Sequence, residues 1–441
     1  MSSAPHPTRV LDTEPIRTEP TDFAATETRV DPAIERTADH ATDRAVDHPT
    51  DRPIDRAVNP ASSSLGISWL SGLEGFSRSI PSSIVPLLAL QALGTRSAVS
   101  YAYLIGSSLA LLATLSVGRL HDLLPRRWIV SISLGMMVAA VSIFAVASGP
   151  LFGVGIALMA TAAAVFSVCV SLFTIESIPR AELTGHESRR MLYNGWAWMT
   201  GPALAGWMHS SLGALAPFAL SATAAGVGLV YFWSIRLGPS ATFTPKASAP
   251  PIAQNIPRFF RQRYLRIAYA VTLVRAMFWV GLFIYGPMYV VDAGLPVWVA
   301  GALLSTAAGL LLASPLIRRA AERRGTRSVV VSGYLVLAVA LGALAWLGEP
   351  APVGVLLWFV AAGGGAMVDV MANVPFMKTV QDDEKVEMTT VFSTWREVSA
   401  MLTPAVGAVV LMVGPFQLFY LTLAVCTALT ALWASSLPRD V

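Results

Sequence analysis

The ionisable residues inside long apolar stretches of the chain include Glu74, Arg78, Arg275 and Asp369, besides Arg396 and Glu397. Charge inside a membrane-spanning segment is costly, and by default it suggests a function. Carboxylate and guanidinium groups at such positions could bind a polar substrate or carry a proton. Glu74 and Arg78 are four residues apart, so they would share one helix face in the favourable order for an ion pair. Structural ion pairing is therefore the alternative, although Arg275 and Asp369 have no partner within their own stretches.

The elements that must position these residues are membrane-spanning helices. The chain has 441 residues, of which 54% are hydrophobic and 13% are charged, whereas globular proteins carry about 25% charged residues. A hydrocarbon core requires about 20 apolar residues per helix. The apolar runs and the breaks between them predict an all-α membrane protein with twelve transmembrane helices, at residues 66–91, 97–117, 128–147, 151–174, 190–209, 213–235, 265–291, 296–317, 328–347, 352–376, 387–411 and 415–436.

The basic residues predict which ends of these helices face the cytoplasm. Residues 1–64 carry a net charge of −5, and residues 65–441 carry a net charge of +9. With the N-terminus inside, 20 of the 24 Lys and Arg residues after position 64 fall in cytoplasmic segments, and only Arg96 falls in an outer loop. This bias follows the positive-inside rule. We therefore expect a multi-pass protein of the inner (cytoplasmic) membrane with both termini in the cytoplasm, and no nucleic-acid binding.

Two segments outside the spans differ in composition from the rest. From Asp31 to position 58 a tetrapeptide that begins with an acid recurs, and the few apolar residues of positions 1–64 predict a disordered low-complexity tail. Residues 238–263 are rich in proline and contain a basic segment, which predicts a cytoplasmic linker. The linker would separate a six-helix bundle at residues 65–237 from a second bundle at residues 264–437, and residues 438–441 would form a short cytoplasmic tail.

The two predicted bundles align when the first is shifted by 201–202 residues. Pro86 then meets Pro287, and Pro202 with its small neighbours meets Pro404. Six helices per half give both halves the same direction through the membrane. We therefore expect parallel pseudo-repeats related by an axis along the membrane normal.

A charged segment between the second and third spans carries the clearest motif. Residues 118–127 read GRLHDLLPRR, and we interpret them as a tight turn. In this segment the motif G-x-L-x-D-x-x-x-R-R of the major facilitator superfamily is matched by Gly118, Asp122, Arg126 and Arg127. Together with the topology, the motif makes residues 65–441 resemble that family. The resemblance implies a cavity between the halves that opens alternately to each side of the membrane, lined by the first, fourth, seventh and tenth helices.

The resemblance also implies gating roles for this segment. An Asp at the position of Asp122 interacts with the start of the eleventh helix and holds the cytoplasmic side closed. Glu176 and Glu182 are candidate partners for the pair Arg126 and Arg127. The second-half counterpart, residues 314–327, has Arg318 in place of Asp122, so its gate cannot be a mirror image.

A second segment is similar to the motif G-x-x-x-G-P-x-x-G-G on helix 5 of drug–proton antiporters. Residues 197–206 read AWMTGPALAG, with Ala197 and Ala205 in place of two glycines. Pro202, like Pro404 in the second half, would bend its helix and free a carbonyl, which suggests gating. Close packing of small residues is the alternative. The fourth span lacks the Arg that such antiporters usually carry, which argues against their usual proton-antiport scheme.

The sequence contains no catalytic constellation. Cys169 and Cys426 are the only cysteines, the histidines lack partners at metal-ligand spacing, and no P-loop is present. We expect no enzyme activity, cofactor or metal. We predict a monomeric secondary active transporter that exports a small molecule by alternating access, with proton coupling at the cavity charges. The alternatives are an organic-anion importer that uses Arg78 and Arg275, and a family-like protein that assists assembly of a membrane complex or organelle without transport.

Overall fold

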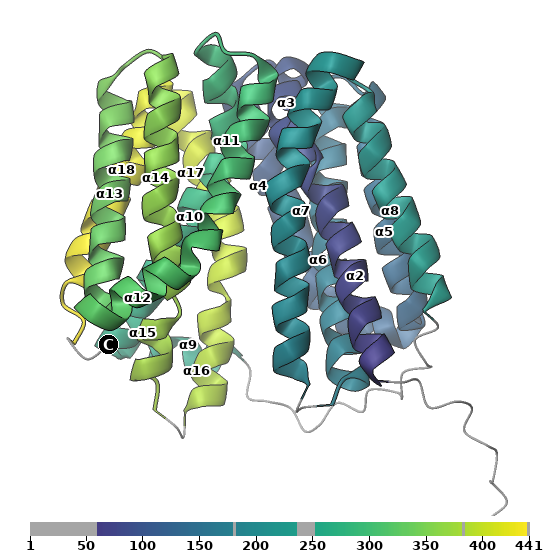
Figure 1. The fold of residues 1–441 in the computed structure, drawn as a ribbon, viewed down its shortest axis with the longest axis horizontal. Helices are drawn as coiled ribbons and strands as arrows, with labels where there is room; N and C mark the ends of the chain where they lie inside the picture. The colour runs from purple at the N-terminus through teal and green to yellow at the C-terminus, as the bar shows by residue number, and fades with distance from the viewer. Residues whose placement is uncertain (1–59, 180–181, 236–251, 382–383, 439–441) are drawn as a thin grey trace, which may run out of the picture. The chain divides into compact units, whose positions relative to one another are not determined.

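The computed structural model describes residues 60–179, 182–235, 252–381 and 384–438 (Figure 1). Within these ranges all regular elements are helices. Most of the predicted tail, residues 1–59, lies outside the described residues, and so does the part of the predicted linker at residues 238–251. The first described helix begins at Pro60, within the stretch that the sequence assigned to the tail.

The first half begins with an interrupted span, made of α2 (Pro60–Ser79), the 3-10 helix η1 (Pro81–Ser83) and α3 (Val85–Leu93). Pro81 opens η1 and Pro86 lies in the first turn of α3, where a missing N–H group is tolerated. The remaining spans of this half are the continuous helices α4 (Arg96–Leu123), α5 (Arg126–Val146), α6 (Pro150–Ser177), α7 (Leu183–Leu212) and α8 (Ala216–Ser234).

The second half is preceded by a short helix, α9 (Ile252–Arg261), in the predicted linker. The Arg258 side chain forms ion pairs with Glu384 at 2.5 Å and with Glu387 at 3.2 Å, so this basic segment is attached to the second half. The following elements are α10 (Arg263–Asp292), α11 (Val297–Gly309), η2 (Leu310–Ala313), α12 (Ser314–Arg324), α13 (Thr326–Trp346), α14 (Pro352–Met371), α15 (Val374–Thr379), α16 (Lys385–Ser393), α17 (Trp395–Val413) and α18 (Phe416–Ala434).

Twelve spans in two groups of six account for the helices of the described residues, with α9 as the extra element, and this confirms the predicted fold class. Ten segments among them are long and apolar enough to cross a membrane. The other two spans are the interrupted one, α2 to α3, and α7, whose first turns contain Glu187, Arg189 and Arg190.

The two charged segments that we interpreted as turns are mostly helical. Helix α4 continues to Leu123, so only Leu124 and Pro125 separate it from α5. Residues 314–324 likewise form α12, and the chain turns at Gly325, which has a φ of +84°. The prediction was wrong because Leu and Arg are good helix formers, and a helix does not have to end where hydropathy falls.

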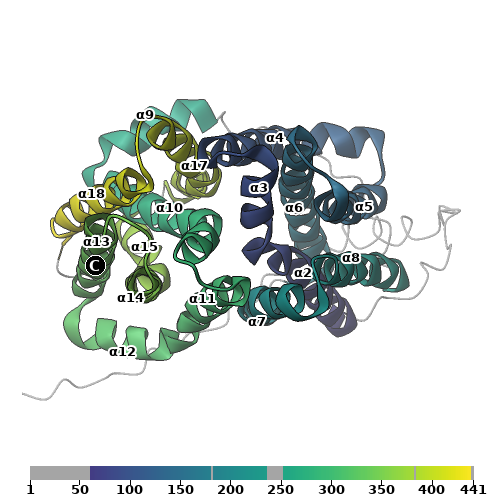
Figure 2. The ribbon, with the colours of Figure 1, turned by 90° about the horizontal axis from the view of Figure 1, so that it is seen from above.

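The halves contact each other in a symmetric pattern. In both views α7 lies beside α11, and α4 lies beside α17 (Figures 1 and 2). Helix α7 is the fifth span of the first half, and α11 is the second span of the second half. Helix α4 is the second span of the first half, and α17 is the fifth span of the second half. A pseudo-twofold axis along the membrane normal produces this reciprocal pairing.

Apolar side chains join the halves at one end. One hydrophobic core cluster contains residues of both halves. Ile84, Val99 and Phe144 belong to the first half, and Tyr285 and Leu303 belong to the second half. These first-half residues lie toward the span ends remote from the basic segments. At the basic end, two further clusters each draw on one half only. The halves therefore share a hydrophobic core mainly at the end opposite the basic segments.

Candidate functional site

The first charged pair lies in the middle of the interrupted span. The Arg78 Nε atom is 3.0 Å from Glu74 Oε1, and the two residues are one helical turn apart on α2. The side chain of Glu74 is 8% exposed, whereas that of Arg78 is 36% exposed. The Arg78 guanidinium also lies over the ring of Trp198 on α7, 5.5 Å from the ring centroid. The predicted ion pair is therefore present, with its cationic member partly accessible.

The second charged pair joins two helices. Arg275 on α10 donates a hydrogen bond through Nη1 to Asp369 Oδ1 on α14, so residues with no partner in their own spans are partners of each other. Their side chains are 11% and 22% exposed. The Arg275 guanidinium lies 4.6 Å from the ring centroid of Trp395 on α17. This arrangement connects α10, α14 and α17 through one cation.

Close helix packing places Asp369. A Cβ atom at Gly364 would lie 2.7 Å from the carbonyl oxygen of Gly333 on α13, and one at Gly365 would lie 2.7 Å from a ring carbon of Phe278 on α10. The missing side chains let α14 approach both neighbours, as small residues do in membrane helix pairs. The approach brings Asp369 within reach of Arg275.

An aromatic contact links the first pair to the second half. Trp198 on α7 meets Phe283 on α10 edge to face, with ring centroids 4.9 Å apart. Since the Arg78 guanidinium also lies over the Trp198 ring, a chain from Arg78 through Trp198 to Phe283 crosses between the halves. Glu74, Arg78 and Trp198 thus form one group, and Arg275, Asp369 and Trp395 form another.

Pro202 lies at the contact between α7 and α11. A Cβ atom at Gly301 on α11 would collide with the Pro202 carbonyl oxygen, and one at Gly206 would lie 2.9 Å from the Trp298 Cα. The Ala203 N–H donates to Ser305 Oγ across the interface at 2.8 Å. The helix 5 motif therefore serves close packing between the halves, the alternative given above for these small residues.

Pro404 lies buried in α17, the helix that forms the symmetry-related contact with α4. One turn further along α17, a Cβ atom at Gly407 would collide with the hydroxyl group of Tyr285, which is 2.6 Å from Ser100 Oγ on α4. The two symmetry-related interfaces therefore both contain a proline and a closely approached glycine. At the second interface the glycine approaches a tyrosine hydroxyl group, whereas at the first interface it approaches backbone atoms.

The gating predictions for the first charged segment concern residues that are only partly described. For Gly118, Asp122 and Glu176 the structure describes the helical backbone alone. Arg126 is buried at the first position of α5, and Arg127 beside it is exposed. The gating roles of this segment, and those of Pro202 and Pro404, therefore stay predictions.

Sequence reasoning missed a polar contact at the opposite end. Arg96, noted above only as the base of an outer loop, pairs with Asp292 at 2.6 Å, and its guanidinium lies 4.8 Å from the ring centroid of Phe416. This pair joins the start of α4 to the end of α10. The signal available in the sequence was a base and an acid, Arg96 and Asp292, at span ends remote from the basic segments. Hydrogen bonds between described residues of the two halves lie at or toward this end.

Within the described residues, no group of three or more His, Cys, Asp and Glu side chains could hold a metal ion. Cys169 in the first half is buried, and Cys426 lies in the second half.

Comparison with known proteins agrees with this architecture. A family model described as Major Facilitator Superfamily matches residues 67–319, more than half of the chain. No curated protein sequence matches the chain. The structure of the nucleoside transporter NupG is similar with a TM-score of 0.69 and 14% identity, covering 85% of this chain and 98% of that one. A peptide transporter POT in complex with sulfate has a TM-score of 0.65 and 14% identity, covering 84% and 93%. At such identities the likeness to solved structures shows the fold alone.

Proposed function

The chain belongs to the major facilitator superfamily, and from this premise we propose that it is a secondary active transporter that moves a small polar molecule across the inner membrane by alternating access. The observation that carries the proposal is the ion pair between Arg275 and Asp369. Charges within a membrane are retained mainly where they act on substrates, ions or protons. A purely structural contact between α10 and α14 would need no charge, because apolar residues of similar size can replace an ion pair without loss of stability.

Proton coupling at Asp369 follows from the chemistry of this pair. The Asp369 side chain is 22% exposed, so its carboxylate can exchange a proton with water. Protonation removes the negative charge opposite Arg275 and weakens the link between α10 and α14. Arg275 then keeps its contact with Trp395 but has lost its link to α14, and the helices can change their relative positions. In this scheme a proton gradient supplies the driving force.

The first-half group supports substrate binding. Arg78 is 36% exposed above the Trp198 ring, while Glu74 balances its charge from a buried position. A guanidinium with free N–H groups can donate two parallel hydrogen bonds to a carboxylate or phosphate, and an aromatic face can hold an apolar part of the same molecule. We therefore assign recognition to Arg78 and Trp198.

The proposed direction is export, supported by the resemblance of residues 197–206 to the helix 5 motif of drug–proton antiporters. The partly exposed Arg78 specifically favours a second candidate, import of an organic anion. For both candidates we propose a monomer in the inner membrane with both termini in the cytoplasm, because the basic residues gather at one end of the spans.

The function can be tested before the substrate is identified. Small molecules in the medium and in the cells would be quantified by mass spectrometry for cells that contain wild-type protein, the Asp369→Asn variant or no protein. We expect at least one compound to accumulate outside wild-type cells, and a protonophore or Asp369→Asn to abolish the difference. Glu384→Gln, which removes an ion pair with Arg258 in the linker, is the matched control and should leave export unchanged.

The outcomes separate the candidates. Accumulation inside the cells would replace export with import. Equal compound levels with and without the protein, at equal amounts in the membrane, would contradict transport and favour the assembly role named above.

A further inference from the structure

A tyrosine from a third helix contacts the backbone of Arg275. Tyr334 on α13 is fully buried, and its hydroxyl group donates a hydrogen bond to the Val271 carbonyl oxygen on α10. The same hydroxyl group accepts a hydrogen bond from the backbone N–H of Arg275. Val271 and Arg275 are four residues apart, so these are the two backbone groups that one turn of an α-helix pairs with each other. Tyr334 therefore contacts the turn of α10 from which the Arg275 side chain projects.

The helix that carries Tyr334 also packs directly on the helix that carries Asp369. A Cβ atom at Gly333 on α13 would lie 2.9 Å from the Gly364 carbonyl oxygen on α14. A Cβ atom at Gly364 would lie 2.7 Å from the Gly333 carbonyl oxygen. Through two consecutive residues, Gly333 and Tyr334, α13 thus contacts both helices of the ion pair.

A buried threonine supplies a direct contact between α10 and α14. Thr272 on α10 is fully buried, and its Oγ1 atom is 3.1 Å from the Ala372 carbonyl oxygen. It is also 3.0 Å from the Ala268 carbonyl oxygen of its own helix, so one hydroxyl proton serves both acceptors. Ala372 follows the last residue of α14, at a helix end where carbonyl groups lack partners within the helix. Thr272 therefore joins this helix end to α10 about one turn before Arg275.

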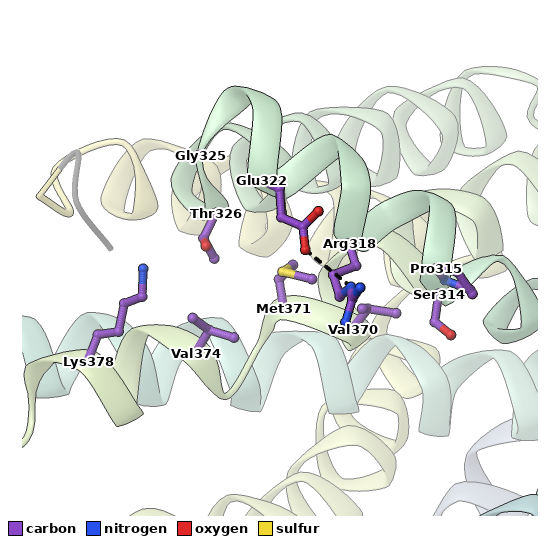
Figure 3. Close-up of a pocket in the computed structure, with 11 residues that line it drawn as sticks. Ser314, Pro315, Arg318, Glu322, Gly325, Thr326, Val370, Met371, Val374 and Lys378 are labelled. Carbon is purple, nitrogen blue, oxygen red and sulfur yellow. Dashed lines mark ion pairs between the residues drawn. The ribbon is translucent and has the colours of Figure 1, made fainter.

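The opposite side of this helix end faces open space. A groove of about 880 Å³ lies between α12 and the end of α14 with α15, and Met371 and Val374 line it (Figure 3). Along this groove α12 does not press on α14. The position of Ala372 therefore depends on the contact with α10.

We propose that Tyr334 and Thr272 are positioning residues for the ion pair between Arg275 and Asp369. They hold α10 and the end of α14 at the separation at which the guanidinium reaches the carboxylate. An arginine side chain loses much rotamer freedom when it is ordered, so a fixed backbone beneath it favours the pair. Both contacts use uncharged groups and persist when Asp369 is protonated, so α10 then turns about them instead of separating from α14. This inference rests on the proposed function, in which Asp369 carries the proton.

Infrared spectroscopy of the purified full-length protein tests this role. The band of protonated carboxyl groups is recorded against pH, and the component that Asp369→Asn removes is assigned to Asp369. Because Arg275 stabilises the carboxylate, a poorly placed Arg275 moves the midpoint of this component to higher pH. One hydrogen bond changes an equilibrium by about fivefold. Tyr334→Phe and Thr272→Val should therefore each raise the midpoint by about 0.7 of a pH unit, whereas Thr272→Ser keeps the hydroxyl group and should keep the wild-type midpoint.

Two matched variants control for a general loosening of the bundle. The Tyr289 hydroxyl group on α10 bonds the carbonyl oxygen and the N–H of Ala351, at 3.3 Å and 3.1 Å, at the start of α14 and far from the ion pair. Tyr289→Phe should leave the midpoint unchanged. Thr427→Val removes a buried hydroxyl group that bonds carbonyl oxygens within α18, and it should also leave the midpoint unchanged.

A second measurement needs no proton uptake by Asp369. The coupling between Arg275→Gln and Asp369→Asn is obtained from thermal unfolding in a double-mutant cycle, and the cycle is repeated in proteins that carry Tyr334→Phe or Tyr289→Phe. The coupling, expressed as an equilibrium constant, should fall about fivefold with Tyr334→Phe. It should stay unchanged with Tyr289→Phe.

The two measurements separate failure of this inference from failure of the proposed function. If the Asp369 component did not titrate, proton coupling at Asp369 would be wrong, and the cycle would still decide whether Tyr334 positions the pair. An unchanged midpoint or an unchanged coupling in Tyr334→Phe would overturn the positioning role. Equal changes in Tyr334→Phe and Tyr289→Phe would also overturn it, because any lost hydroxyl contact between helices would then have the same effect.

Discussion

The two halves of the molecule repeat one arrangement of six spans but hold their membrane charges differently. In the first half Glu74 and Arg78 pair within α2, so the pair moves with that helix as a unit. In the second half Arg275 and Asp369 pair between α10 and α14, so a relative movement of these helices changes the distance between the charges. The difference shows that a repeated backbone can place charge in two ways, one suited to presenting it and one suited to sensing helix movement.

The largest effect is expected from breaking the second pair. Removal of one partner from a buried ion pair costs about 3 kcal/mol, because the other charge remains without compensation. Asp369→Asn and Arg275→Gln should each lower the unfolding temperature in detergent, and the double variant should recover part of the loss. Glu74→Gln should cost less, because the Arg78 side chain is 36% exposed and can be hydrated when it loses its partner. A matching cycle of Glu74→Gln and Arg78→Gln measures the coupling energy of the first pair. Equal coupling energies in the two cycles, from thermal unfolding, would contradict the comparison.

A second contrast concerns the two contacts between the halves. Gly301→Ala would press a Cβ atom against the backbone carbonyl of Pro202, which cannot move without α7. Overpacking of this kind costs about 2 kcal/mol. Gly407→Ala would press a Cβ atom against the hydroxyl group of Tyr285 rather than against backbone, so its cost should be nearer 1 kcal/mol, about the value of the lost hydrogen bond to Ser100.

Unfolding temperatures of these variants check that order. Gly342→Ala on α13 is the control, since a Cβ atom there meets nothing within 4 Å. A larger loss for Gly407→Ala than for Gly301→Ala would show that the tyrosine contact is the more rigid of the two.

The contrast between the halves also shows what the sequence could and could not reveal. Apolar runs, basic residues and the offset between Pro202 and Pro404 were sufficient for twelve spans in parallel repeats, because bilayer thickness and charge placement act locally along the chain. The pairing of Arg275 with Asp369 joins residues 94 positions apart and depends on how closely α14 packs on α10. Helix periodicity contains no information about such a contact.

The charged segments show a limit of another kind. Hydropathy falls at Gly118 and at Ser314, but the helices continue to Leu123 and Arg324. Backbone hydrogen bonding does not require apolar side chains, so loss of hydropathy marks the membrane boundary rather than the helix end. The turns lie at Pro125 and Gly325, where the chain loses an N–H donor or adopts a positive φ.

The outer ion pair offers a test of how the halves separate. Arg96 and Asp292 are 37% and 23% exposed, and pairs this accessible contribute about 1 kcal/mol or less. Asp292→Asn should therefore raise outward opening by no more than about fivefold. The reporter is a cysteine at Leu88 on α3, which contacts α10 at this end, with Cys169 and Cys426 replaced by alanine. Its labelling rate by an impermeant maleimide from outside should rise, whereas Glu384→Gln, which breaks a pair within the second half, should leave the rate unchanged.

The smallest effect is expected at the basic ends of the two halves, where the same reporter should move in the opposite direction. Asp122 lies in the last turn of α4. The family resemblance predicts that it holds the basic side closed, so Asp122→Asn should disfavour the outward-open state and slow labelling by about twofold, the value of a weak charge contact. Arg318 occupies the corresponding place in the second half but pairs with Glu322 inside α12, so Arg318→Gln leaves the contacts between the halves intact. If both variants slowed labelling equally, the basic ends of the two halves would have equal roles in closing that side of the protein. The difference between the halves would then be limited to their charged pairs within the membrane.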